Sequence, residues 1–163
     1  MNVVLGGTFD PVHDGHRALF ERAFELGDLT VGLTSDDLAP KTRNVDRYVR
    51  PFDERKADLE RELAALAADH DREFEVRRLE EPTGVADEPG FDVLIASPET
   101  VEGAEQVNEK RERKGLDPLE IEVVDHVYAE DGDVISSTRI VAGEIDDHGN
   151  LTPERDGRPA SRD

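Results

Sequence analysis

The chain of 163 residues contains neither cysteine nor tryptophan, and aromatic residues make up only 5% of it. The absence of cysteine excludes disulfide bonds, thiolate catalysis and cysteine-ligated zinc or iron–sulfur sites. No apolar run approaches the roughly 18 residues that a membrane span requires. The first residues also lack the basic segment that is typical of a secretory signal. We therefore expect a cytoplasmic protein with no membrane partner.

Basic residues are scarce as well. Four lysines and 16 arginines face 40 acidic residues, so that the formal net charge is −20. Nucleic-acid binding relies on basic side chains that neutralise phosphates, and this balance therefore argues against a nucleic-acid partner. At about 1 M salt the Debye length is roughly 3 Å, and dense surface carboxylates no longer repel one another strongly. The composition is thus typical of a halophilic organism, and a homo-oligomer is compatible with it.

Apolar segments alternate with amphipathic segments along the chain. Their periodicity predicts strands at residues 3–5, 29–33, 74–79, 91–96 and 119–124, and helices at residues 15–26, 53–69, 97–114 and near Ser137. Strands that alternate with helices at this spacing form crossover connections and a parallel sheet. We expect an α/β fold, a single doubly wound Rossmann-like domain with a five-stranded, mostly parallel sheet. This domain would span residues 1–145, and a polar, loose tail would span residues 146–163.

The loop after the first predicted strand, residues 6–16, reads GGTFDPVHDGH. Its two leading glycines allow the backbone to approach a phosphate closely. His13 and His16 are three residues apart at a helix start, so that both rings can face one anion at the positive end of the helix. Gly15 removes a side chain that would clash with a large anion. These features predict a polyphosphate clamp. Taken alone, the pair would also fit helix-start histidines without a ligand, or a metal site.

The ten residues from Gly7 to His16 resemble the signature of the HxGH nucleotidyltransferase superfamily. Its members transfer a nucleotidyl group from ATP or CTP to a phosphate and release pyrophosphate. The resemblance implies that both histidines are catalytic. It also implies that the loop binds ATP and its phosphates through Gly6, Gly7, Thr8, Phe9, His13 and His16.

A second motif, ISSTRI at residues 135–140, resembles the late phosphate-binding loop of that superfamily. Hydroxyl groups and exposed amides at a helix start can donate to phosphate oxygens, and an arginine adds a positive fork. The resemblance implies phosphate binding by Ser136, Ser137, Thr138 and Arg139. The superfamily often places its arginine later, where this chain has the apolar Val141 and Ala142. By itself the segment would also fit a serine N-cap beside an incidental arginine.

Residues 41–56 form a basic window in this acidic chain. The window has six basic and three acidic residues, a charge of +3, which leaves −23 on the rest of the chain. An enzyme that joins two phosphate-bearing substrates needs such a region, although a solvated basic surface is the alternative. The resemblance implies that Lys41 is catalytic and contacts the acceptor phosphate together with Thr8. Arg47 and Arg50 are further candidates for that phosphate, and Arg55 is expected to be structural.

The middle and the end of the chain resemble the archaeal phosphopantetheine adenylyltransferases. The resemblance is carried by SPET at residues 97–100, NEKR at 108–111, GLDPL at 115–119 and the segment 135–146. It implies the transfer of the adenylyl group of ATP to 4′-phosphopantetheine, with dephospho-CoA and pyrophosphate as products. It further implies Mg²⁺ held mainly by ATP phosphates, with no metal site on the protein. The alternatives are FAD synthesis, cytidylyl transfer and a non-catalytic nucleotide-binding regulator.

Overall fold

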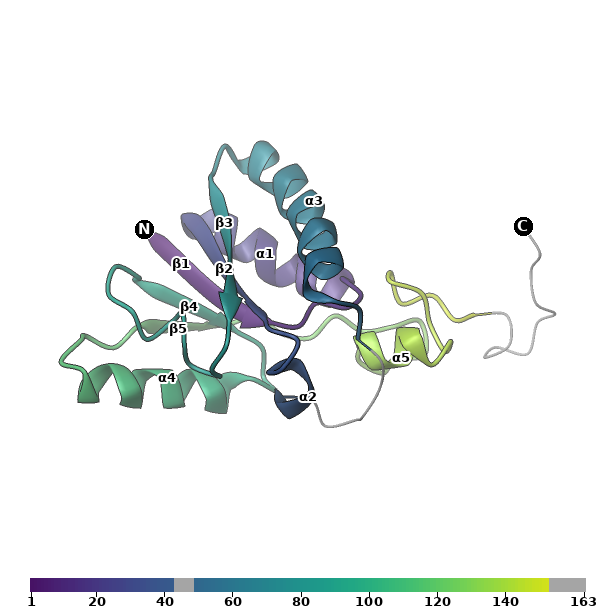
Figure 1. Ribbon diagram of the computed structural model, residues 1–163. Coiled ribbons are helices and arrows are strands. Elements are labelled where there is room, and N and C mark those ends of the chain that lie inside the picture. Colours follow the sequence, from purple (N-terminus) through teal and green to yellow (C-terminus); the bar gives the residue numbers. More distant parts are fainter. Residues whose placement is uncertain (43–48, 153–163) are drawn as a thin grey trace.

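The computed structural model describes the backbone of residues 1–42 and 49–152 and the side chains of residues 1–40 and 49–152. The elements in chain order are β1 (Asn2–Gly7), α1 (Asp14–Leu26), β2 (Asp28–Thr34), α2 (Ala39–Thr42), α3 (Phe52–His70), β3 (Phe74–Leu79), β4 (Val93–Ala96), α4 (Val101–Arg113), β5 (Glu120–Val123) and α5 (Ser137–Val141) (Figure 1). The five strands predicted from the periodicity are therefore present.

The strands form one sheet in the order β3-β2-β1-β4-β5, and all four neighbouring pairs are parallel. The chain builds outward from β1 to β3 and then crosses to β4 on the other side of β1. This reversal makes the fold doubly wound, and the predicted α/β class is confirmed. In such sheets ligands bind beyond the carboxyl ends of the strands, where the order reverses.

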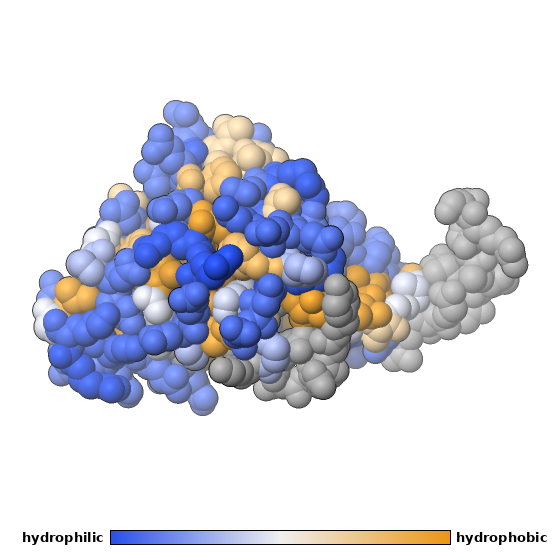
Figure 2. Space-filling model, viewed as in Figure 1, coloured by the Kyte–Doolittle hydropathy of each residue, from blue (hydrophilic) through white to orange (hydrophobic). Residues whose placement is uncertain are grey.

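Helices cover both faces of the sheet (Figure 1). α1 and α3 pack together on one face, where the side chains of Phe20, Phe24, Leu59 and Leu63 are fully buried. α4 covers the other face through a separate apolar cluster that includes Val107. Hydrophilic residues cover most of the surface seen in Figure 2. The two apolar clusters hold β1 and β4 in place, and with them the loops at their carboxyl ends.

Two features differ from the prediction. The helix expected to begin at Ser97 begins at Val101, because the Oγ1 atom of Thr100 accepts a hydrogen bond from the Ser97 amide at 2.9 Å and closes a turn first. The first part of the expected loose tail is packed: residues 146–152 fold back on α1, where the Asp147 carbonyl accepts from the Asp14 amide at 3.0 Å. Residues 153–163 lie outside the described part.

Candidate active site

The two histidines of the first motif stack at the N-terminus of α1. Their ring centroids are 3.7 Å apart, with 21° between the ring planes. Both rings are also anchored to the backbone. The Nδ1 atom of His13 accepts a hydrogen bond from the Gly15 amide at 3.0 Å, and the Nδ1 atom of His16 accepts one from the His13 amide at 3.3 Å. This reciprocal capping fixes both rings before any ligand arrives.

Both histidines are neutral at pH 7. Burial and the nearby Arg17 lower the pKa of His13 to about 4, although Asp14 and Asp147 oppose the shift. Burial, His13 and Arg17 lower the pKa of His16 well below 6.5. Because each Nδ1 atom accepts from a backbone amide, the single proton of each ring is on Nε2. The pair therefore offers two N–H donors and carries no net charge.

The glycines of this loop make room for rings of the loop itself. A Cβ atom on Gly15 would lie 2.8 Å from the Cε1 atom of His13, and one on Gly7 would lie 2.9 Å from the Phe9 ring. The expectation that Gly15 makes room for an anion is thus replaced by a different role, since the His13 ring fills that space. Phe9 has a φ of 50° and packs its ring edge against His16 at 4.8 Å between centroids.

Thr8 follows β1 and is tied to the end of β2. Its Oγ1 atom lies 2.9 Å from the Oγ1 atom of Thr34, and its carbonyl accepts a hydrogen bond from Arg55 at 3.3 Å. The side chain of Arg55 is fully buried and also donates to the carbonyl of Arg50 and to Asp36. The structure therefore places Arg55 as a brace between α3 and the strand ends, in agreement with its expected structural role.

The second motif lies against the first. The Oγ atom of Ser137 donates to the Pro11 carbonyl at 2.8 Å, although the two residues are 126 positions apart. Ser136 caps the five-residue helix α5 by accepting from the Arg139 amide at 3.2 Å. Thr138 is in the same turn. The structure thus brings the start of α5 next to the histidine loop.

Arg139 is held by its own surroundings. Its guanidinium contacts Asp131 at 2.5 Å and Glu144 at 3.3 Å, and it donates to the Val134 carbonyl at 3.1 Å. Only 16% of this side chain is exposed. These contacts connect the segments before and after α5 and support the alternative of an incidental arginine beside a serine cap.

The basic window is less positive in three dimensions than in sequence. Arg50 donates from its amide and its Nε atom to the buried Asp10 at 2.7 and 2.6 Å, and its Nη1 atom lies 2.5 Å from Asp58. Its charge is therefore neutralised within the protein. Lys41 is in α2, close after the carboxyl end of β2, but its side chain lies outside the described residues. Arg47 is wholly outside them.

A cavity of about 670 Å³ opens at the carboxyl ends of β1, β2 and β4. It lies at the point where the strand order reverses, and Gly6, Gly7 and Thr8 of the first motif form part of its wall. The opposite walls come from α4 and from the segment after β3, which contribute Val85, Ala86, Glu102, Gly103 and Gln106 among others. Both apolar and polar side chains line the cavity.

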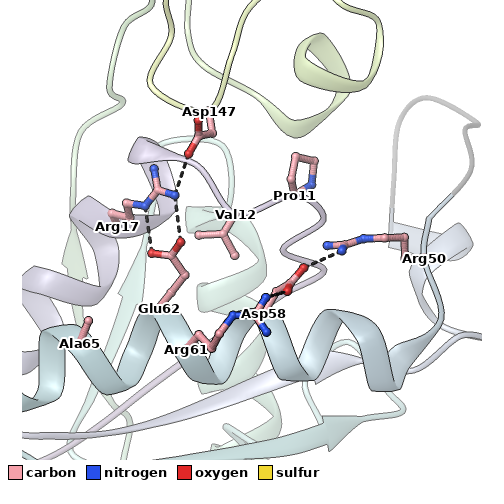
Figure 3. A pocket seen from close by; sticks show the side chains of 9 residues that line it. All are labelled: Pro11, Val12, Arg17, Arg50, Asp58, Arg61, Glu62, Ala65 and Asp147. Atoms are coloured by element: carbon pink, nitrogen blue, oxygen red, sulfur yellow. Dashed lines mark hydrogen bonds and ion pairs between the residues drawn. The ribbon is translucent and has the colours of Figure 1, made fainter. Parts of the chain in front are cut away.

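A second cavity of about 470 Å³ lies between α1, α3 and residues 146–152, and it contains two sets of ion pairs (Figure 3). Arg17 contacts Glu62 at 3.0 Å and Asp147 at 2.9 Å. In the second set Asp58 is held between Arg50 and Arg61. Carboxylates of the protein thus engage all three arginines that line this cavity. The ion pairs of Arg17 connect α1 to α3 and to residues 146–152.

Neither a metal site nor a membrane span is found in the part of the chain that the structure describes. No three histidine, aspartate or glutamate side chains there are grouped as a metal site would require. Within the same residues, no helix is long and apolar enough to cross a membrane.

The two motifs could be recognised from the sequence, but most of the cavity could not. Residues 82–86 sit in a loop without periodicity, and the cavity-lining residues of α4 belong to a helix that is polar on most sides. One signal was available. Gly32 interrupts the predicted strand 29–33, and a glycine inside a strand often marks a close approach of other atoms. In the structure Val85 packs over it.

Comparisons with known proteins agree with this geometry. Residues 4–143 match the cytidylyltransferase-like family. The chain is 43% identical to the phosphopantetheine adenylyltransferase of Methanosarcina acetivorans, over 93% of this chain and 96% of that protein. It is 42% identical to the phosphopantetheine adenylyltransferase of Archaeoglobus fulgidus, over 93% and 99% respectively.

Solved structures give the same picture. The crystal structure of a protein of unknown function from Archaeoglobus fulgidus has a TM-score of 0.66 and 38% identity, and the match covers 77% of this chain and 90% of that one. A pantothenate synthetase from Thermus thermophilus, with a TM-score of 0.55 and 21% identity over 97% of this chain and 64% of that one, shares the fold. The chain therefore belongs to the cytidylyltransferase-like family and, within it, to the phosphopantetheine adenylyltransferases, which are nucleotidyltransferases.

Proposed function

We propose that the protein transfers the adenylyl group of ATP to 4′-phosphopantetheine and so produces dephospho-CoA and pyrophosphate. One observation carries the proposal: two fixed, neutral imidazoles with Nε2–H donors lie at the start of α1, in the same loop whose first residues, Gly6 to Thr8, line a cavity at the strand ends. The relatives named above, at 42–43% identity, are called phosphopantetheine adenylyltransferases.

The reaction needs no general base from the protein. The second pKa of a phosphate monoester is near 6, so that the acceptor phosphate is largely dianionic at pH 7. One of its oxygens attacks the α-phosphorus of ATP, and the bond from that phosphorus to the oxygen bridging to the β-phosphate breaks. Pyrophosphate leaves with the electron pair. The protein must then position the two substrates in line and stabilise the charge that develops on the phosphoryl oxygens.

The first motif supplies that stabilisation. His16 is assigned to the bridging oxygen, where charge develops as the bond breaks, and His13 to a neighbouring phosphate oxygen. Neutral N–H donors suit this task, because they keep their protons throughout the reaction. Ser136, Ser137 and Thr138 are assigned to the other ATP phosphates because their turn is bonded to Pro11 of the same loop. The phosphates of ATP, with water, are the natural ligands of Mg²⁺, which prefers oxygen donors and retains several waters. The nearby carboxylate of Asp10 is already engaged by Arg50.

The cavity at the strand ends is assigned to the acceptor. Thr8 lines this cavity and belongs to the loop that carries the histidines, and its hydroxyl can donate to the acceptor phosphate. Lys41, placed in α2 close to the same edge of the sheet, is assigned to that phosphate as well. The remaining walls would enclose the pantetheine arm. Because Arg50 is paired with Asp10 and Asp58, we assign it to holding the loop.

The test is an assay of purified protein in molar KCl with ATP, Mg²⁺ and 4′-phosphopantetheine. We expect dephospho-CoA and pyrophosphate in equal amounts. His16→Ala should lower kcat by about 10²-fold, the usual effect of losing one transition-state donor. His70→Ala is the matched control, because His70 ends α3 just before the amino end of β3, whereas the site lies at the carboxyl ends of the strands. Turnover of FMN or a polyol phosphate, with none of phosphopantetheine, would overturn the acceptor assignment.

A further inference from the structure

Arg111 of α4 is a buried cation whose partners are backbone carbonyls. Its side chain is 3% exposed. Its Nη1 atom donates to the carbonyls of Ala86 at 2.9 Å and Glu88 at 2.6 Å, and its Nε atom donates to the carbonyl of Asp117 at 2.7 Å. A buried charge is costly unless hydrogen bonds satisfy it. This guanidinium therefore ties the segment after β3 to the turn that follows α4.

Asp87, within the same segment, forms ion pairs with lysines of α4 and its C-cap. It is 3% exposed, although it lies in a loop. Its carboxylate is 3.1 Å from the Nζ atom of Lys114 and 3.5 Å from that of Lys110, and it accepts from the hydroxyl of Thr83 at 3.3 Å. Three cations from the last turns of α4 and its C-cap thus converge on residues 83–88.

The held segment forms one wall of the acceptor cavity. Val85 and Ala86 line that cavity, and Val85 is buried against β2. A Cβ atom on Gly32 would lie 3.4 Å from the Cγ2 atom of Val85, so the loop packs directly on the strand backbone. Arg111 donates a hydrogen bond to the carbonyl of Ala86 but is not itself among the residues that line the cavity. The packing of Val85 on β2 and the hydrogen bond from Arg111 to the Ala86 carbonyl thus hold this wall of the cavity in place.

We propose that Arg111 is a positioning residue for the acceptor: it holds residues 82–88 as a rigid wall of the cavity and so determines how tightly the acceptor arm is bound. The inference rests on the assignment of this cavity to the acceptor in the proposed function. Arg111 acts through the loop and does not touch the substrates. Its loss should therefore weaken acceptor binding and leave ATP binding and the chemical step in place.

The decisive variant is Arg111→Lys. Lysine keeps the positive charge, but it lacks the planar guanidinium whose several N–H donors reach three carbonyls at once. The KM for phosphopantetheine should rise about tenfold, which corresponds to about 1.4 kcal/mol. The KM for ATP should change less than about twofold, and kcat at saturation less than about threefold, as expected when the lost binding of the acceptor was equally strong in the ground state and the transition state. Arg113→Lys is the matched control, because Arg113 is exposed on the same helix.

A second readout does not depend on activity. Amide hydrogen exchange of residues 83–88 should quicken in Arg111→Lys and stay unchanged in Arg113→Lys. Lys114→Met, which removes a half-exposed partner of Asp87, should produce a smaller change in the same direction. It serves as the test if Arg111→Lys does not fold.

Two results would overturn the inference. One is an unchanged acceptor KM despite faster exchange in the loop, and the other is an equal rise in both KM values. The proposed function is judged separately by turnover of phosphopantetheine in the wild type. If the wild type turns over a different phosphate acceptor, the same comparison is made with the KM of that acceptor.

Discussion

Replacing Gly15 by alanine tests whether the fixed position of the His13 ring matters for catalysis. The new Cβ atom would lie 2.8 Å from the Cε1 atom and 2.9 Å from the Nδ1 atom of His13. Atoms cannot remain this close, and the ring must therefore move. Because its Nδ1 atom accepts from the Gly15 amide, the movement breaks the N-cap of α1 and shifts the Nε2 donor at the same time.

The expected change in stability is the sum of opposed effects. Alanine in place of glycine normally stabilises a helix by about 1 kcal/mol. Loss of the cap costs about 1 kcal/mol, and a ring pushed off its rotamer costs about 1 kcal/mol more. The variant should be less stable by about 1 kcal/mol, which lowers the Tm by roughly 2–4 °C for a chain of this length. Displacement of a catalytic donor by about 1 Å should lower kcat by about 10²-fold.

Thermal unfolding and steady-state kinetics measure the two effects on the same sample. Gly103→Ala in α4 is the stability control, since no atom lies within 4 Å of the added Cβ, and its Tm should rise. If Gly15→Ala also raised the Tm and retained the kcat of the wild type, the fixed His13 ring would have no part in catalysis.

Two further predictions concern stability. Because burial holds the pKa of His13 at about 4, and an unfolded histidine titrates near 6.5, the unfolded state binds more protons between these values. The contribution of His13 to the free energy of unfolding should therefore be fully present above pH 6.5. It should fall as the pH drops toward 4, by up to about 1.4 kcal/mol per pH unit. Urea unfolding of wild type and His13→Asn should show this part of the slope only in the wild type. Arg55→Met should lower the free energy of unfolding by about 3 kcal/mol, because it strips a buried guanidinium from its partners. The exposed Arg61→Met should change it by less than about 0.5 kcal/mol, and an equal effect of both changes would contradict the role of Arg55.

The fold could be predicted because its signals are local. The apolar run at residues 3–5 and the periodic spacing of Phe20 and Phe24 each follow from burial of one face of one element. The spacing of His13 and His16 similarly reports on one helix start. No local rule predicts the contact between Ser137 and Pro11 across 126 residues. The family resemblance implied only that both motifs bind phosphate.

Charge counting failed where the partner of a charge is distant in sequence. The window at residues 41–56 counts as +3, yet Arg50 is neutralised by Asp10, 40 positions earlier, and Arg55 is buried as a brace. The same limit hid the tail contact of Asp147 with Arg17. Ion pairs of this kind depend on which loops the fold brings together. A sequence therefore shows how many charges exist but not which ones remain available to a ligand.

The availability of charge explains why the histidines matter in this chain. A protein with a net charge of −20 repels polyphosphates at long range, and its described arginines near the site are already paired with carboxylates. Recognition of ATP must then rest on short, directional hydrogen bonds, which salt screens far less than it screens the field of distant charges. Two desolvated imidazoles, each with its proton fixed on Nε2, meet that requirement. In the proposed function their low pKa values serve binding, because a neutral donor keeps its proton and its direction at any pH above its pKa.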